Sequence, residues 1–459
     1  MYFVQHYIDC LSQASYLIGD ETSGQAVVVD PRRDIEDYLT DAADHGLSIV
    51  GVINTHIHAD FVSGHLEMAA ETGAWMGFGQ AAQTDLDIRR LRHGERISLG
   101  DVTLEILETP GHTPESVSVL VFEHAEDSVP YGVLTGDTLF IGDVGRPDLL
   151  ASLGVTADEL GRALYRSVQH TLMSLPDQVR VFPAHGAGSA CGKNLSTERQ
   201  STIGEQRALN YACQPMSEEA FVAVVTEGQP PAPSYFVFNA TINRQDRGLR
   251  DLDERSPALE SAQVDAELAA GAVLLDTRDP IMFAAGHLPG SVNVPADGRM
   301  AETVGMVLQP QQRIVVMADD GRHEEVVTRL ARIGFDAVAG HVADPEGYLL
   351  SHSETVRPAS RLTISQLTAA VATEDAQLVD IRNVGELEAG MVPGAVNIPL
   401  AQLAGRVGEL DPARPVVVYC AGGWRSSVGG SLLRAKGLSD VSDLLGGYAA
   451  WASTHPQAS

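Results

Sequence analysis

Short apolar runs alternate with stretches of helical periodicity through residues 1–245. The apolar runs are rich in Val, Ile and Leu, as β-strands are. They predict strands at residues 26–30, 48–54, 102–108, 116–122, 131–134 and 179–182, and the helical periodicity predicts helices at residues 35–45 and 160–172. This alternation is typical of a mixed α/β domain.

The second half of the chain repeats one pattern. Leu-Asp-Thr-Arg at residues 275–278 recurs as Val-Asp-Ile-Arg at 379–382, and Pro-Gly-Ser-Val-Asn-Val-Pro at 289–295 recurs as Pro-Gly-Ala-Val-Asn-Ile-Pro at 393–399. Both copies continue to an apolar run that predicts a buried strand, at residues 314–317 and 416–419. Such a repeat predicts two tandem α/β domains, each with a parallel sheet flanked by helices.

The length of the chain and its polar stretches set the predicted domain boundaries. At 459 residues the chain exceeds what a single hydrophobic core organises. Polar stretches at residues 247–256 and 357–360 predict linkers. We therefore expect a multidomain α/β protein with domains at residues 1–247, 258–355 and 360–459.

Composition narrows the range of partners. The formal net charge is −30, from 61 acidic residues against 31 lysines and arginines. A surface this acidic disfavours binding to nucleic acid and to anionic membranes. The chain starts without the features of a signal peptide, and no apolar run approaches membrane length. Its four cysteines include no CxxC pair, which argues against a disulfide scaffold and favours a reducing cytoplasm.

Candidate metal ligands cluster in Thr-His-Ile-His-Ala-Asp-Phe at residues 55–61, after the strand predicted at 48–54. His56, His58 and Asp60 lie on one tight turn and converge on a point, as the ligands of a metal ion do. A two-metal site of this type would continue with another histidine. Phe61 takes that position and cannot donate a lone pair, so the segment predicts one ligand fewer at a second metal position.

Three further strand ends bear matching residues. They are His112 in Thr-Pro-Gly-His-Thr, Asp137 in Thr-Gly-Asp-Thr and His185 in Pro-Ala-His-Gly. One histidine of the first loop, together with His112 and Asp137, would form a two-His, one-carboxylate face with open positions. That ligand set is typical of non-haem Fe(II) sites that react with O2. A single histidine is most often a core or surface residue, but four such motifs at strand ends favour a metal site.

In this order the four motifs resemble the metallo-β-lactamase fold, and Ile-Gly-Asp-Val-Gly-Arg-Pro-Asp at residues 141–148 resembles its persulfide dioxygenase branch. The resemblance implies an αββα sandwich with the metal at one edge. By position, it implies His56, His112 and Asp137 as the ligands of one Fe(II). It also implies that three residues orient these ligands or water molecules, namely His58, Asp60 and His185.

Two residues near this site each have two interpretations. Arg146 offers a cation for the carboxylate of a persulfide substrate, or it forms a structural ion pair with Asp143 or Asp148. Cys191 borders the metal pocket as a sulfur-relay thiol, or it is structural. We expect His65, on the helix after the first loop, to pack or to cap the helix and not to bind metal.

A second reactive segment, Cys-Ala-Gly-Gly-Trp-Arg-Ser-Ser, follows the strand predicted at residues 416–419. Successive backbone N–H groups and a helix N-terminus stabilise negative charge on Cys420, and Arg425 adds a cation, so the pattern predicts a nucleophilic thiolate. A tyrosine-phosphatase loop is a rival, but C-x4-R is one residue shorter than C-x5-R. With Asp380 and Arg382 upstream, the domain resembles a rhodanese. This implies a Cys420 persulfide cradled by the loop residues Ala421, Gly422, Gly423, Trp424 and Ser426.

The first copy of the repeat departs from the second at the cysteine. Ala318 takes the place of Cys420, and Asp319 and Asp320 put two carboxylates into a loop that holds an anion in the other copy. This copy resembles an inactive rhodanese-homology domain. We expect it to have a scaffolding or docking role.

The complete order of domains resembles the bacterial persulfide dioxygenase–rhodanese fusions of sulfide detoxification. The resemblance implies that a low-molecular-weight thiol persulfide and O2 react at one Fe(II) per chain to give sulfite and thiol. Cys420 would then exchange sulfur with thiosulfate, in either direction. Two rivals stay open: a binuclear-zinc thioester or lactone hydrolase, which Phe61 disfavours, and a sulfur-binding sensor or carrier with a structural metal. Exchange of a small anion between sites is compatible with a homo-oligomer.

Overall fold

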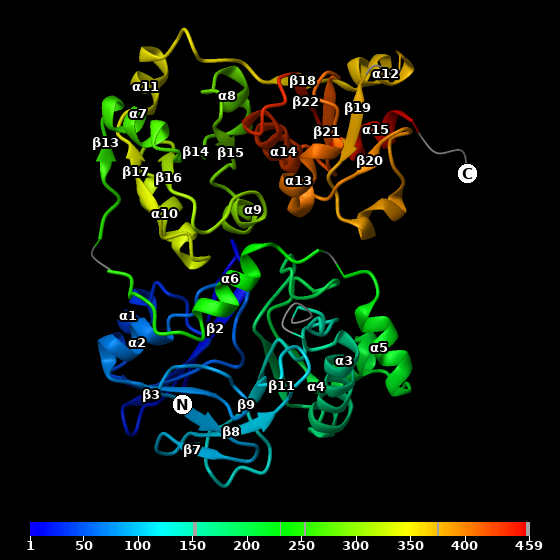
Figure 1. Cartoon of the computed structure of the whole chain (residues 1–459). Helices are drawn as coiled ribbons and strands as arrows, with labels where there is room; N and C mark the ends of the chain where they lie inside the picture. Colours follow the sequence, from blue (N-terminus) through cyan, green and yellow to red (C-terminus); the bar gives the residue numbers. More distant parts are fainter. Residues whose placement is uncertain (150–153, 230, 252–253, 374–375, 456–459) are drawn as a thin grey trace. The chain divides into compact units, whose positions relative to one another are not determined.

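Two six-stranded sheets form the centre of the N-terminal part of the chain (Figure 1). The computed structural model describes residues 1–149, 154–229, 231–251, 254–373 and 376–455. The first sheet, in the order β1-β2-β3-β4-β5-β6, comprises β1 (Tyr2–Ile8), β2 (Gln13–Asp20), β3 (Gln25–Val29), β4 (Ser48–Ile53), β5 (Trp75–Gly79) and β6 (Arg89–Leu91). The second, in the order β12-β11-β10-β9-β8-β7, comprises β7 (Arg96–Ser98), β8 (Thr103–Glu108), β9 (Val117–Phe122), β10 (Gly132–Gly136), β11 (Arg180–Pro183) and β12 (Ser201–Thr202).

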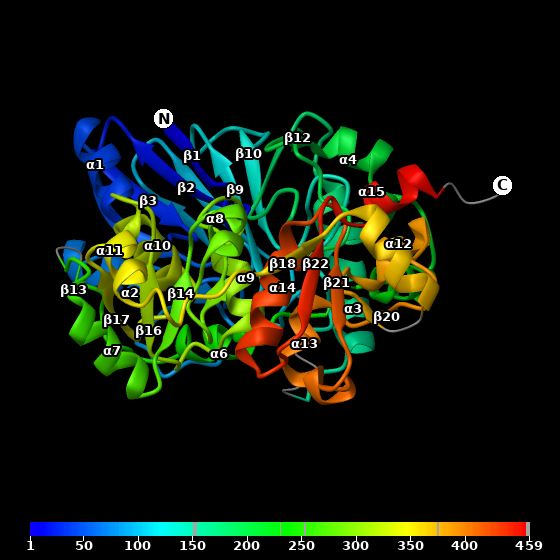
Figure 2. The same cartoon turned by 90° about the horizontal axis from the view of Figure 1, so that it is seen from above.

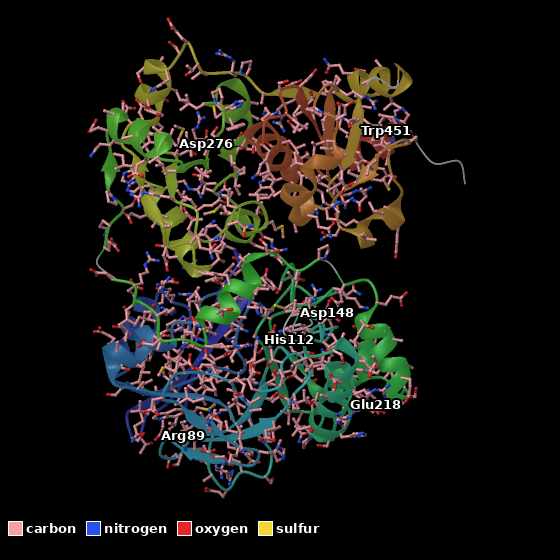
Figure 3. All side chains as sticks on the ribbon, in the orientation of Figure 1. Arg89, His112, Asp148, Glu218, Asp276 and Trp451 are labelled. Carbon is pink, nitrogen blue, oxygen red and sulfur yellow. The ribbon has the colours of Figure 1, made fainter. Side chains whose placement is uncertain are left out.

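Alternation of side chains along each strand separates an inner face from an outer face. Val27 and Val29 of β3 lie in one hydrophobic cluster with Leu104 and Val119 of the second sheet. Val28, between the two valines, points the other way and joins a cluster with helical residues. The two sheets therefore pack face to face across a shared core, and side chains fill the interior (Figure 3).

Helices cover the outer face of each sheet. Tyr38 of α1 (Glu36–Asp44) and Met68 of α2 (His65–Thr72) pack on the first sheet. Leu164 of α3 (Ala157–Arg166) packs on the second sheet, together with α4 (Ile203–Leu209) and α5 (Glu218–Thr226). A further helix, α6 (Tyr235–Ile242), follows in the chain. The four layers confirm the predicted αββα sandwich.

The predicted strands of this part are confirmed to within two residues at each end. The second predicted helix starts earlier than expected, because Thr156 and Glu159 form a capping box before Ala157. Sequence patterning misses β2, because polar residues in it are buried and hydrogen-bonded. Gln13 donates to the Asp30 carbonyl over 3.0 Å, and the Ser15 hydroxyl lies 2.6 Å from that of Tyr38.

Two five-stranded sheets, both entirely parallel, form the C-terminal part (Figures 1 and 2). The first, in the order β13-β17-β16-β14-β15, comprises β13 (Ala258–Leu259), β14 (Val273–Asp276), β15 (Val292–Asn293), β16 (Ile314–Met317) and β17 (Val338–Val342). The second, in the equivalent order β18-β22-β21-β19-β20, comprises β18 (Ser360–Leu362), β19 (Gln377–Asp380), β20 (Val396–Asn397), β21 (Val416–Tyr419) and β22 (Val441–Leu444). The identical strand order confirms the tandem α/β repeat.

Helices separate the strands of both copies, as parallel crossovers require. The first copy has α7 (Ser261–Ala269), α8 (Pro280–Ala285), α9 (Met300–Val307), α10 (His323–Arg332) and α11 (Pro345–Ser351). The second has α12 (Ile364–Thr373), α13 (Leu400–Arg406), α14 (Trp424–Ala435) and α15 (Gly447–Thr454).

The chain divides into two compact units, Met1–Gln229 with Phe236–Glu254, and Pro230–Tyr235 with Arg255–Ser459. Part of the stretch predicted as a linker therefore belongs to the N-terminal unit. Arg247 pairs with Glu67, with 2.6 Å between Nη1 and Oε1, and donates to the Ser63 carbonyl over 2.7 Å. The boundaries at residues 1–247, 258–355 and 360–459 stay predictions.

Candidate metal centre and sulfur-transfer loop

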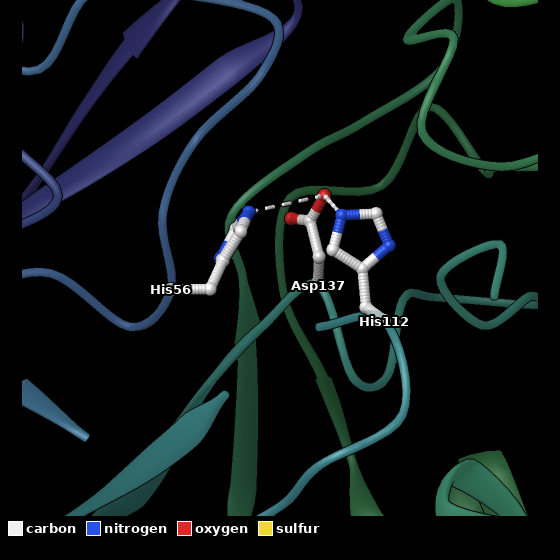
Figure 4. Close-up of side chains that lie close together, drawn as sticks. All are labelled: His56, His112 and Asp137. Carbon is white, nitrogen blue, oxygen red and sulfur yellow. Dashed lines mark ion pairs between the residues drawn. The ribbon is translucent and has the colours of Figure 1, made fainter. Parts of the chain in front are cut away.

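Three strand ends bring His56, His112 and Asp137 together (Figure 4). His56 follows β4 of the first sheet, and the other two follow β8 and β10 of the second. The Nε2 atoms of His56 and His112 lie 3.9 and 3.5 Å from Oδ2 of Asp137. All three side chains are buried. The expected two-His, one-carboxylate set thus assembles at the edge where the two sheets meet.

Hydrogen bonds fix which nitrogen of each imidazole faces this centre. Nδ1 of His112 lies 2.9 Å from the Arg146 carbonyl, which can only accept, so Nδ1 carries the proton. Nδ1 of His56 lies 3.0 Å from the Thr55 hydroxyl, whose own proton goes to Asp30 over 2.8 Å. Both Nε2 atoms therefore keep a free lone pair, as a metal ligand must.

The donor atoms fit a divalent metal ion. In the part of the chain that the structure describes, Nε2 of His56 and both carboxylate oxygens of Asp137 are buried without a hydrogen-bond partner. An unpaired buried polar group costs about 1–3 kcal/mol, which a bound cation would offset. Burial, with the nearby His58 and His112, lowers the pKa of His56 well below its ordinary value. His56 is therefore neutral, which is the state that ligates metal.

Asp30, at the end of β3, supports the first loop. Its Oδ1 accepts from the Thr55 backbone N over 2.7 Å and lies 2.9 Å from Nε2 of His58. Burial opposes protonation of His58, but the charge and hydrogen bond of Asp30 and the charges of Asp60 and Asp137 together raise the pKa of His58. Asp30 has a backbone φ of +53°, which non-glycine residues adopt rarely. Sequence analysis missed this residue, and an acidic residue ending a predicted strand was the available signal.

A second buried group lies beside the first. Nε2 of His185 is 3.3 Å from Oδ2 of Asp60 and 3.5 Å from Oδ1 of Asp137. Cys191 joins Asp60 and His185, with one donor atom of each within 4.8 Å of the others. Burial, aided by the charges of Asp60 and Asp137, raises the pKa of the Cys191 thiol well above its ordinary value. Cys191 therefore borders the metal centre as a neutral thiol.

Phe61 packs beside His58 in the loop that carries the candidate ligands. Its side chain is buried, and its ring lies 4.3 Å from that of His58. His65 is buried as well and packs edge-on against Phe78, with 5.4 Å between ring centroids. This is the packing role expected of His65.

Arg146 forms the structural ion pair that was one of its two interpretations. Its Nε and Nη2 donate to the two carboxylate oxygens of Asp148, both over 2.7 Å. Nη1 donates to the Ala190 carbonyl over 3.3 Å, and the Arg146 backbone carbonyl holds His112. Contact with a substrate carboxylate stays a prediction. Asp143, the other candidate partner, instead accepts from the backbone N of Lys193 over 2.7 Å.

The Cys420 loop places hydrogen-bond donors near the sulfur, as an anionic sulfur requires. Sγ of Cys420 accepts from the Gly423 backbone N over 3.1 Å and lies 3.7 Å from the Ser426 hydroxyl. Gly423 has φ +98°, and a Cβ there would lie 3.1 Å from the backbone N of Gly446. Only glycine adopts this conformation readily. Trp424 and Arg425 begin α14, so the helix N-terminus adjoins the sulfur.

Arg425 is paired with a residue that sequence analysis missed. Its guanidinium donates to both carboxylate oxygens of Glu386, over 2.6 and 2.7 Å. Glu386 lies 39 positions earlier in the chain. The signal for such a partner is present only in three dimensions, because nothing in the local sequence links the two residues.

The first copy keeps the loop position but not the cysteine. Ala318 follows β16 as Cys420 follows β21, and it is buried. Asp319 and Asp320 after it are exposed. His323 stacks on His341, with ring centroids 3.7 Å apart. The copy therefore lacks the cysteine, and His323 takes the position aligned with Arg425.

A domain family and a curated relative match different halves of this chain. The rhodanese-like domain family matches residues 260–342 and 363–454. The human protein named persulfide dioxygenase ETHE1, mitochondrial, is 31% identical over 235 residues, which cover 50% of this chain and 82% of that protein. The chain belongs to the ETHE1 family.

Two further comparisons bear on this membership. A solved metallo-beta-lactamase structure from Staphylococcus aureus is 33% identical, with a TM-score of 0.67, and the match covers 74% of this chain and 98% of that one. A hydroxyacylglutathione hydrolase of Polaromonas is 33% identical over 177 residues, covering 37% of this chain and 61% of the hydrolase. The expected fusion of an ETHE1-like domain with two rhodanese-like domains is confirmed, as is the metallo-β-lactamase fold.

The helices of this ETHE1-family chain are short. Within the described residues, none is both long and apolar enough to cross a membrane.

Proposed function

We propose that the protein is a persulfide dioxygenase with a coupled sulfurtransferase domain. Its N-terminal unit oxidises a low-molecular-weight thiol persulfide: R–S–SH + O2 + H2O → R–SH + SO3²⁻ + 2 H⁺. The observation that carries the proposal is the buried triad of His56, His112 and Asp137 with unpartnered donor atoms. Membership of the ETHE1 family supports it, because a relative bears the name persulfide dioxygenase.

The residues of the chain prepare this site for one metal ion. His56, His112 and Asp137 would hold a single Fe(II), which would supply the redox chemistry for the reaction with O2. Thr55 and the Arg146 carbonyl keep both imidazoles in the ligating tautomer. Phe61 removes a ligand from the second metal position, which favours one iron per chain over two zinc ions.

Asp60, His185 and His58 hold the surroundings of the triad in place. His58 contacts Asp30 over 2.9 Å, and Nε2 of His185 lies 3.3 and 3.5 Å from carboxylate oxygens of Asp60 and Asp137. These residues surround the donor atoms of the triad and would orient them or nearby water molecules.

At the second site, Cys420 carries sulfane sulfur as a persulfide. It takes the outer sulfur from a donor and passes it to sulfite: Cys–S–S⁻ + SO3²⁻ → Cys–S⁻ + S2O3²⁻, or the same step runs in reverse. The Gly423 N–H and the N-terminus of α14 stabilise the anionic sulfur. We place this chemistry in the cytoplasm, where a thiolate nucleophile stays reduced.

Iron content measured together with O2 uptake on a panel of thiol persulfides tests the proposal. We expect one iron per chain, one O2 consumed per persulfide, and sulfite as the product. Two zinc ions per chain with thioester hydrolysis and no O2 uptake would instead identify a hydrolase. Persulfide loss at equal rates with and without O2 would contradict the dioxygenase reaction and favour a sulfur carrier.

A further inference from the structure

The cation of the Cys420 loop is neutralised by a fixed carboxylate. Besides its two bonds from Arg425, Glu386 accepts from the Asn383 backbone N over 2.9 Å. Burial opposes ionisation of Glu386, but the hydrogen bonds and charge of Arg425 outweigh it and lower the pKa of Glu386. Glu386 is therefore ionised at neutral pH and held from two sides.

The tandem repeat provides an internal control for the role of such pairs. Asp380 and Arg382 form a bidentate ion pair beside the loop, with 2.6 Å between Nη2 and Oδ2. Asp276 and Arg278 form the same pair in the Cys-less copy, over 2.5 Å. Because this ion pair is present both with and without the cysteine, we assign it a structural role in the domain.

The Glu386–Arg425 pair has no counterpart in the Cys-less copy. Met282 stands six positions after Asp276, as Glu386 stands after Asp380, and it is 54% exposed. His323 stands five positions after Ala318, as Arg425 stands after Cys420. Neither a carboxylate nor a guanidinium is present at these two aligned positions. Arg322, one position before His323, pairs instead with Asp297 and Glu325. The pair therefore serves the chemistry of Cys420.

Its electrostatic effect follows from the charges involved. The charges of Glu386 and Arg425 cancel, as do those of Asp380 and Arg382. The anion is therefore stabilised by backbone N–H groups and the helix N-terminus. Attack on thiosulfate gathers three negative charges: Cys–S⁻ + S2O3²⁻ → Cys–S–S⁻ + SO3²⁻, where the S–S bond breaks and sulfite leaves with its electron pair. Attack on an alkyl persulfide, Cys–S⁻ + R–S–S⁻ → Cys–S–S⁻ + R–S⁻, gathers only two. A neutral loop penalises the first reaction more than the second.

We propose that Glu386 is a specificity-determining residue that disfavours thiosulfate, relative to singly charged persulfides, as the sulfur donor to Cys420. The inference rests on the proposed sulfurtransferase function and deepens it. Attack of sulfite on the Cys420 persulfide is the reverse of the thiosulfate reaction and gathers the same three charges, so Glu386 sets which donor loads Cys420 and not the direction of the thiosulfate step.

The test compares two donors in the full-length protein. Glu386→Gln keeps the size of the side chain and an oxygen that accepts from Arg425, but removes the charge. Thiosulfate and 2-hydroxyethyl persulfide serve as donors, with cyanide as the common acceptor, so that kcat/KM for each donor reports the loading of Cys420. We expect Glu386→Gln to raise kcat/KM about tenfold for thiosulfate and about threefold or less for the persulfide.

Two matched variants serve as controls. One tests the position of the carboxylate at constant charge, and the other tests the net charge of the domain. Glu386→Asp keeps the charge but shortens the side chain, and it should lower both rates with the donor ratio near that of the unmodified protein. Glu409→Gln neutralises an exposed pair with Arg406 in the same domain and should leave the ratio unchanged.

The decisive quantity is the ratio of kcat/KM for thiosulfate to kcat/KM for the persulfide. The role of Glu386 would be overturned if Glu386→Gln left this ratio unchanged, or if Glu386→Asp or Glu409→Gln changed it equally. Absence of transfer from either donor in the unmodified protein would be a different result. That result would contradict the sulfurtransferase function itself.

Discussion

The metal centre and the Cys420 loop are both buried reactive sites, but they are assembled in opposite ways. The candidate ligands His56, His112 and Asp137 come from three strand ends of two sheets, and they would act through side-chain atoms. The loop consists of consecutive residues from Cys420 onward, and it acts through backbone N–H groups. A dispersed site depends on supports elsewhere in the fold, whereas a local loop depends on its own backbone conformation. The two sites should therefore fail independently and for different reasons.

The largest expected effect is at the metal centre. Asp137→Ala removes the carboxylate that lies within 4 Å of both imidazole ligands, at 3.9 and 3.5 Å. We expect loss of bound iron and of O2 uptake, measured by metal analysis and an oxygen electrode. Thiosulfate:cyanide sulfur transfer by the same preparation should be unchanged. Loss of both activities would show that the sites are not separable.

Cys420→Ser is the reciprocal change. It removes the nucleophile but not the loop amides, so sulfur transfer should disappear. Sulfite formation from persulfide and O2 should continue, and thiosulfate should vanish from the products. Chromatography of sulfite and thiosulfate measures the ratio. An unchanged ratio would mean that the two sites are not coupled as proposed.

Asp30→Asn tests the dependence of the dispersed site on a distant support. It weakens the contacts that hold Thr55 and His58, at 2.7 and 2.9 Å from the carboxylate. Loss of such a support lowers metal affinity by roughly 10- to 100-fold. Competition with a chelator measures this affinity. Asp37→Asn, at an exposed residue of α1, is the control and should bind iron normally. Equal affinity in both variants would contradict the role of Asp30.

The sequence predicts the Cys420 loop more fully than the metal centre, because the loop is local in the sequence and the metal centre is not. The loop at residues 420–426 could be predicted from consecutive residues, and the structure brings the Gly423 N–H and the Ser426 hydroxyl to Sγ of Cys420. The metal ligands were predicted by a resemblance that joins separate motifs, but Asp30 was not. Its role depends on β3 lying beside β4, a pairing that local patterns do not encode. Glu386 was missed for the same reason, since only the folded sheet brings it to Arg425.

Gly423→Ala tests the dependence of the loop on its backbone. The φ of +98° and the 3.1 Å approach to Gly446 leave little room for a Cβ. The left-handed conformation costs an alanine about 1–2 kcal/mol. We expect a loop that relaxes away from Cys420 and a sulfur-transfer rate lower by about tenfold, with O2 uptake unchanged. Gly422→Ala is the matched control, because no atom lies within 4 Å of its Cβ position. Equal rates in the two variants would contradict the proposed strain.

The smallest expected effect concerns His65 of the N-terminal unit, a histidine outside the candidate ligand set. Burial, aided by the charge of Arg247, lowers the pKa of His65 to about 3. Between its unfolded value of about 6.5 and pH 3, the unfolded chain binds a proton that the folded protein does not. The free energy of unfolding therefore decreases as the pH is lowered through this window, by up to about 1.4 kcal/mol per pH unit. His65→Leu should flatten the pH dependence of the free energy of unfolding, measured in urea between pH 6.5 and 5. An unchanged slope would show that His65 is protonated in the folded state. Burial would then not be what keeps this histidine neutral.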